Sequence, residues 1–245
     1  EKRVALVPDV INKFTKLGYE VIIESGAGIY AQATDKDYED AGAKIASEVL
    51  KDADVVLSVQ PLTPDQASSL KKGAVTISFL SPTTAVENIE ALAKAGATSF
   101  SMELVPRISR AQSMDVLSSQ ANIAGYKAVL TAAMQYSRYF PMFMTAAGSI
   151  PPAKILILGA GVAGLQAIAT AKRLGGVVEV FDTRPAVKEE VMSLGAKFVE
   201  VEGAADASKA GGYAVEQSED FQRKQRDKIH EHAKKSDIII TTAQI

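Results

Sequence analysis

Short apolar runs rich in valine and isoleucine alternate along the chain with longer segments that mix polar and apolar residues. The runs have the length and composition of buried strands, and we expect strands at 19–24, 55–59, 75–79 and 98–102. The segments between them predict helices at 35–42, 63–70 and 84–95. Strands separated by helices indicate βαβ units and a parallel sheet.

A second series of the same kind follows a long segment rich in Ala, Leu, Met and Gln. That segment, 118–138, predicts a helix long enough to link two domains. After Pro141 and the turn-forming stretch 148–152 we expect strands at 154–158, 177–182, 197–201 and 237–242, with helices at 161–174 and 185–194. The pattern therefore predicts two successive α/β domains, 1–140 and 141–245, that meet near residue 140.

Composition narrows the class of protein. A net charge of −2 over 245 residues argues against a general nucleic-acid binder, which would present a basic face to the phosphates. The absence of cysteine excludes disulfides and thiolate metal sites. The chain starts at Glu1 without methionine and stops at Ile245, so we expect a natural N-terminus and a C-terminal segment, one that completes both domains, to lie outside it.

The first strand of the second series runs into a glycine motif with the spacing G-x-G-x-x-G. Gly159 permits the tight turn, Gly161 removes a side chain that would block a pyrophosphate, and Gly164 lets helix and strand pack closely. Val162 opens a helix whose N–H groups and dipole favour phosphate. The order of these parts predicts a dinucleotide on a Rossmann-like, doubly wound domain. A purely structural βαβ unit remains the alternative.

The next strand ends in an acid, Asp182, 18 residues beyond Gly164. A carboxylate there accepts hydrogen bonds from both adenosine ribose hydroxyls and repels a 2′-phosphate, which favours NAD(H) over NADP(H). Arg184 follows two residues later and could instead meet a phosphate. We give more weight to the acid and interpret Arg184 as lining the adenine pocket.

The segment PRISRAQSMDVLSSQ at 106–120 is much more specific than the glycine motif. It closely resembles a loop of the NAD(H)-binding component of proton-translocating nicotinamide nucleotide transhydrogenase. The likeness continues at 121–128, 145–148, 151–154, 181–185, 211–214 and 241–243, and so spans nearly the whole chain.

This resemblance implies roles for individual residues. The residues that hold the nicotinamide end of NAD(H) would be Arg107, Gln112, Asp115 and Ser118. Tyr213 would sit on a mobile loop that closes over the site, and Ala243 and Gln244 would border the cofactor, in a cleft between the two domains. Gln244 and Gln217 stand where many members of the family have leucine and methionine.

The resemblance also implies partners. It implies an NADP(H)-binding component that receives the hydride, a transmembrane proton-channel component, a homodimer, and a peripheral location on the cytoplasmic side of the inner membrane. Hydride transfer between two nicotinamides needs orientation and exclusion of water but no general acid or base. The two histidines, His230 and His232, fit that view, since we interpret both as a solvated helix face and expect no metal site.

Two other functions stay open. The chain also resembles alanine dehydrogenase through residues 3–6, but the lysine and histidine that such an enzyme uses fall here on Gln60 and Ser81. Neither residue can exchange protons at neutral pH. An NAD-sensing module that binds without chemistry is the second alternative, and hydride exchange with the partner components would separate it from the transhydrogenase.

Overall fold

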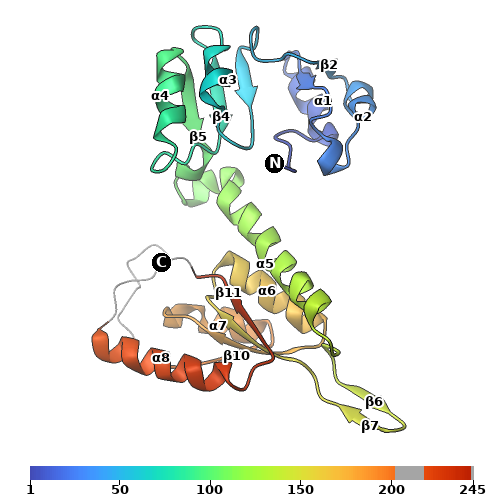
Figure 1. The fold of residues 1–245 in the computed structure, drawn as a ribbon, viewed down its shortest axis with the longest axis vertical. Helices are drawn as coiled ribbons and strands as arrows, with labels where there is room; N and C mark the ends of the chain where they lie inside the picture. Colours follow the sequence, from blue (N-terminus) through green and yellow to red (C-terminus); the bar gives the residue numbers. More distant parts are fainter. Residues whose placement is uncertain (202–217, 244–245) are drawn as a thin grey trace. The chain divides into compact units, whose positions relative to one another are not determined.

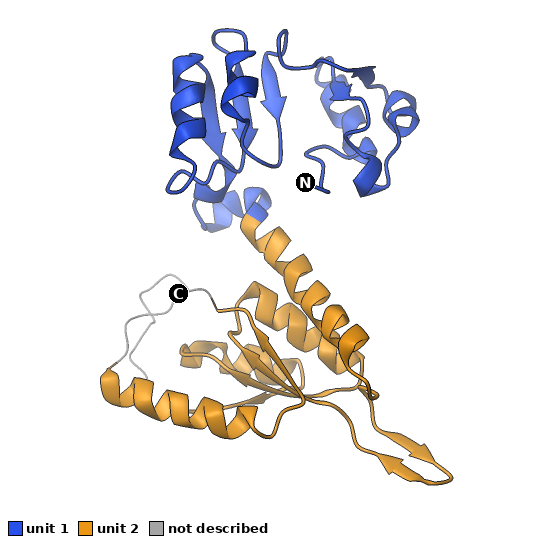
Figure 2. Ribbon diagram, in the orientation of Figure 1, with its two compact units in different colours: residues 1–116 blue, residues 117–245 orange. Residues whose placement is uncertain are grey.

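The computed structural model describes residues 1–201 and 218–243. Within it the chain divides into two compact units, Glu1–Val116 and Leu117–Ile245 (Figure 2). Both units alternate helices with parallel strands (Figure 1). The α/β class predicted from the hydrophobic pattern is therefore confirmed. The domain boundary near residue 140 stays a prediction.

Unit 1 contains two small parallel sheets. Strands β1 (Ile22–Glu24) and β2 (Lys44–Ala46) pair with each other, and β4 (Val75–Ser78) lies between β3 (Val55–Leu57) and β5 (Thr98–Ser101). Its helices are α1 (Pro8–Lys16), α2 (Asp35–Asp40), α3 (Pro64–Ser68) and α4 (Val86–Lys94), with 3-10 turns η1 (Ile29–Ala31), η2 (Met102–Leu104) and η3 (Ser109–Met114).

Local capping explains why α3 begins where it does. The hydroxyl of Thr63 accepts a hydrogen bond from the backbone N–H of Gln66 at 3.3 Å, and the Gln66 side chain accepts one from the Thr63 N–H at 3.0 Å. This reciprocal arrangement satisfies two N–H groups that the helix itself leaves unpaired. The helix expected at 63–70 is thereby confirmed.

Unit 2 is built on one four-stranded parallel sheet in the order β10-β9-β8-β11. These strands are β8 (Lys154–Leu158), β9 (Val177–Phe181), β10 (Lys197–Phe198) and β11 (Ile238–Thr241). Its helices are α5 (Val116–Gln135, whose first residue belongs to unit 1), α6 (Val162–Arg173), α7 (Lys188–Ser193, after the 3-10 turn η4 at Pro185–Val187) and α8 (Glu219–Ala233).

Helices cover both faces of this sheet. Val178 and Val180 of β9 belong to the hydrophobic core that includes Ile168 of α6. Glu179, between the two valines, points to the opposite face because side chains alternate along a strand, and there it contacts His232 of α8. Helices α6 and α8 thus lie on opposite faces, as a doubly wound sheet requires.

The sequence pattern missed three elements. Helix α1 and strand β2 are short and bury few side chains, Ile11 being the one fully buried residue of α1. Strands β6 (Phe143–Thr145) and β7 (Gly148–Ile150) form an antiparallel hairpin in which five of the six residues are exposed. Since neither of its strands buries one face, the alternation that normally reveals a strand is missing.

Candidate functional site

The glycine loop lies at the carboxyl edge of the unit 2 sheet, where the strand order reverses between β8 and β11. The chain runs β8, β9, β10 to one side and then returns to place β11 on the other side of β8. In doubly wound sheets this topological switch point is where ligands bind. Gly159 follows β8 there, and Asp182 and Thr242 follow the neighbouring strands β9 and β11.

Each motif glycine has a different steric reason to be glycine. Gly159 has a φ of +101°, and a Cβ on it would lie 2.8 Å from the Thr242 hydroxyl and 2.9 Å from the Ala243 nitrogen. A Cβ on Gly164 would collide with the carbonyl of Gly159. A Cβ on Gly161 would meet no described atom within 4 Å. Packing therefore explains two of the glycines, and Gly161 leaves space at the loop.

Helix α6 starts at this open position. Gly161 is its N-cap residue, and no side chain of the described residues caps the helix there. The N–H groups of the first turn, beginning with Val162, are consequently available to an anion, and the helix dipole adds partial positive charge. The space left by Gly161 and these donors together fit a pyrophosphate.

Asp182 lies beside the loop and is tied to it. Its Oδ2 accepts a hydrogen bond from the Ala160 N–H at 2.7 Å, and its Oδ1 accepts one from the Arg184 N–H at 2.8 Å. The Arg184 guanidinium donates two more, from Nε to Oδ1 at 2.9 Å and from Nη2 to Oδ2 at 2.7 Å. Burial raises the pKa of this carboxyl, but these hydrogen bonds outweigh it, and the net pKa lies below the ordinary aspartate value. Asp182 is therefore ionised at neutral pH.

The nicotinamide-binding residues expected from the resemblance lie around η3. Arg107 precedes it, Gln112 lies on it and is exposed, and Asp115 ends it; Ser118 is in the first turn of α5. The structure brings two of them together, since Arg107 Nε lies 3.6 Å from Asp115 Oδ2. Ser118 belongs to unit 2, whereas the other three belong to unit 1.

Several expected positions contribute less. Tyr213, Gln217 and Gln244 lie outside the described residues. Gln60 follows β3 and Ser81 follows β4, so both lie past the carboxyl ends of neighbouring strands. Within the described ranges no cluster of three or more His, Asp or Glu side chains has a metal-binding arrangement. Among those same residues, no helix is both long enough and apolar enough to cross a bilayer.

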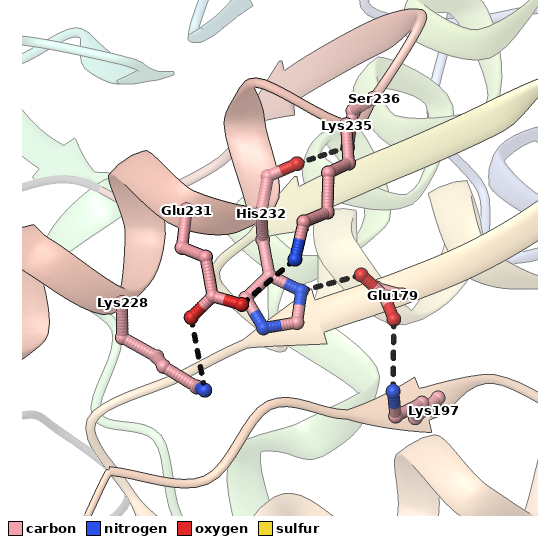
Figure 3. A network of polar contacts seen from close by, with 7 residues as sticks. All are labelled: Glu179, Lys197, Lys228, Glu231, His232, Lys235 and Ser236. Atoms are coloured by element: carbon pink, nitrogen blue, oxygen red, sulfur yellow. Dashed lines mark hydrogen bonds and ion pairs between the residues drawn. The ribbon is translucent and has the colours of Figure 1, made fainter.

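The interpretation of His232 as a solvated side chain is wrong. His230 is exposed, but His232 is buried, with 9% of its surface accessible, and its Nδ1 lies 2.5 Å from Glu179 Oε2 (Figure 3). Glu179 also contacts Lys197 of β10 at 3.1 Å. A single acid within an apolar strand was the signal that could have revealed this contact, because a buried carboxylate needs a partner.

Figure 3 shows that this network is structural. On α8, Glu231 pairs with Lys228 at 3.2 Å and with Lys235 at 2.8 Å. Each carboxylate that lines the adjoining cavity of about 420 Å³ has a lysine or histidine partner. The network joins α8 to the sheet, and it lies on the sheet face opposite α6, away from the helix that the glycine loop begins.

Comparison with known proteins agrees with this geometry. Residues 1–124 match the family model "Alanine dehydrogenase/PNT, N-terminal domain", and residues 128–245 match its C-terminal domain. An NAD(P) transhydrogenase subunit alpha of Rhodospirillum rubrum is 52% identical over the whole chain, which spans 66% of that relative's length. Alanine dehydrogenase of Mycolicibacterium smegmatis is 32% identical over 74% of the chain and 50% of its own length.

A solved structure is similar over the same extent. The transhydrogenase from Sinorhizobium meliloti has a TM-score of 0.91 and 50% identity, with 100% of this chain and 67% of that one covered. The expected resemblance is thus confirmed over both units. The chain belongs to the alanine dehydrogenase/PNT family, within which it resembles the transhydrogenase alpha subunits more closely than the alanine dehydrogenase.

Proposed function

We propose that this chain is the NAD(H)-binding part of a proton-translocating transhydrogenase. The observation that carries the proposal is the position of Asp182. Its carboxylate ends β9, accepts a hydrogen bond from Ala160 of the glycine loop, and is ionised. An acid there suits the two hydroxyls of an adenosine ribose and opposes a 2′-phosphate.

The rest of the switch point supports the same ligand. The space at Gly161 admits a pyrophosphate, and the first-turn N–H groups of α6 bind its oxygens. Arg184, Ala243 and Gln244 border the nucleotide on this proposal. The bound nicotinamide supplies the hydride chemistry, and the residues of the chain orient and enclose it.

Arg107, Gln112, Asp115 and Ser118 are proposed to hold the nicotinamide half, with Tyr213 closing over it. Gln112 and Asp115 suit the carboxamide and ribose hydroxyls, since an amide both donates and accepts and a carboxylate accepts. The ion pair of Arg107 with Asp115 orients the carboxylate. Because none of these groups has to transfer a proton, the scarcity of histidine is no obstacle to hydride exchange.

The proposed partners follow from the similarity to transhydrogenase subunits. Hydride passes to NADP(H) on a separate component, and a transmembrane component couples the transfer to proton movement. The subunit is proposed to act as a homodimer, peripheral to the membrane on its cytoplasmic side. An alanine-dehydrogenase activity is less well supported, since Gln60 and Ser81 do not titrate near neutral pH.

A hydride-transfer assay tests the proposal. The full protein, mixed with a purified NADP(H)-binding component, is expected to reduce an NAD⁺ analogue with NADPH as donor. Arg107→Ala is expected to lower that rate, whereas Arg110→Ala, on the same exposed turn, is the matched control and is expected to leave it unchanged. Binding of NADH without turnover would identify a sensor, and turnover of L-alanine would identify a dehydrogenase.

A further inference from the structure

The carboxylate expected to hold the ribose already has its hydrogen-bonding positions filled. Two bonds come from the backbone N–H groups of Ala160 and Arg184, and two come from the Arg184 guanidinium. A carboxylate offers about four acceptor positions. The Asp182 side chain is only 5% exposed, and the Arg184 side chain that pairs with it is 20% exposed. A ribose therefore cannot reach Asp182 while the guanidinium stays in place.

We propose that Arg184 is a specificity-determining residue that occupies the ribose-binding face of Asp182 and that the adenosine ribose of NAD(H) displaces. This inference rests on the proposed function, since it concerns the same nucleotide site. The exchange is balanced in hydrogen bonds: the ribose hydroxyls replace the bonds from Nε and Nη2. The two backbone bonds persist and keep the carboxylate oriented throughout.

The same pair discriminates against NADP(H). A 2′-phosphate would bring a second negative charge beside Asp182, and like charges at this distance repel. It would also find the guanidinium, its natural partner, already bound to the acid. The pKa of Arg184 is raised chiefly by its hydrogen bonds to Asp182, so the cation is retained at any working pH. Asp182 thus selects the ribose directly, and it also withholds Arg184 from a phosphate.

Titration of the full protein with NADH and with NADPH, followed by nucleotide fluorescence, tests the displacement. Arg184→Ala is expected to bind NADH about fivefold more tightly, since the ribose no longer competes with a partly exposed ion pair. Arg184→Lys, which cannot form the paired hydrogen bonds, is expected to fall between the two. Arg223→Ala, which removes an exposed partner of Asp220, is the matched control and leaves the affinity unchanged.

The acid partner gives a second, independent comparison. Asp182→Ala is expected to weaken NADH binding and strengthen NADPH binding by releasing the guanidinium, and Asp182→Ala combined with Arg184→Ala is expected to lose that gain. A structural role for the pair would not reverse the nucleotide preference. If the unmodified protein binds NADH and Arg184→Ala or Arg184→Lys binds it equally or more weakly, the displacement is wrong and the proposed function stands. If the unmodified protein binds no NADH, both fail.

Discussion

The hydroxyl of Thr242 donates a hydrogen bond to the carbonyl oxygen of Gly159 at 3.0 Å. It joins the end of β11 to the glycine loop after β8, across the point where the strand order reverses. The close approach leaves no room for a side chain on Gly159, whereas Gly161, two residues later, faces open space. Steric demands of the fold and of the ligand can therefore be separated within one motif.

Gly161→Ala is expected to weaken NADH binding at least about tenfold, because the new methyl group occupies the space meant for the pyrophosphate. The fold should lose no more than about 1 kcal/mol, the cost of a poorer N-cap residue. Gly164→Ala is the contrasting variant, since its methyl group collides with the Gly159 carbonyl and costs about 1–3 kcal/mol of stability. Isothermal titration and urea unfolding measure the two quantities. Normal NADH binding by Gly161→Ala would show that the pyrophosphate lies elsewhere.

Gly125→Ala is expected to destabilise unit 2 by about 1–3 kcal/mol, since the added carbon collides with the backbone carbonyl of Ala163 where α5 crosses α6. Urea unfolding measures the loss. Asn122→Ala is the control on the same helix: it removes one exposed hydrogen bond to Gln166 at 3.1 Å and should cost about 1 kcal/mol or less. Equal effects from the two variants would contradict the close packing.

His232→Ala is expected to cost about 1–3 kcal/mol, because it leaves the Glu179 carboxylate on the sheet without its partner from α8. His230→Ala, two residues away on the exposed side, should change stability by less than about 0.5 kcal/mol. NADH affinity should be unchanged in both, since the network lies on the face opposite α6. Similar losses of stability from the two variants would mean that the buried contact contributes nothing.

The contact of Glu179 also predicts a dependence on pH. Burial raises the pKa of this carboxyl, but hydrogen bonds from His232 and Lys197 outweigh it, and the folded-state pKa lies below the ordinary glutamate value. The stabilisation is therefore complete above the unfolded pKa of about 4.3 and is lost as the pH falls through the lower folded value. The stability difference between Glu179→Gln and the unmodified protein should shrink on acidification below about pH 4, as unfolding curves between pH 3 and 7 would show. A constant difference would contradict the ion pair.

The phosphate loop could be predicted from the sequence because its parts are consecutive. Strand, glycines, helix and acid follow one another, and the structure places Gly159 and Asp182 at neighbouring strand ends. The partner of Asp182 was harder to predict. Arg184 is adjacent in sequence, but whether its side chain turns to the acid or to the adenine depends on side-chain conformation, which no sequence pattern fixes.

His232 illustrates a second reason for failure. The polar run 219–235 predicts a solvated helix, and most of α8 is solvated. The exception depends on Glu179, 53 positions earlier in the chain, and local periodicity contains no information about that partner. The long-range contacts around Thr242 and Gly159 were missed for the same reason, although the glycines that permit them were identified.

Titration of the unmodified full protein with NADH and, separately, with NADPH tests the central claim most directly. The ionised carboxylate of Asp182 at the end of β9 predicts a strong preference for NADH, because a 2′-phosphate there meets a negative charge. Equal or tighter binding of NADPH would contradict the account, and would mean that Arg184, rather than Asp182, selects the nucleotide.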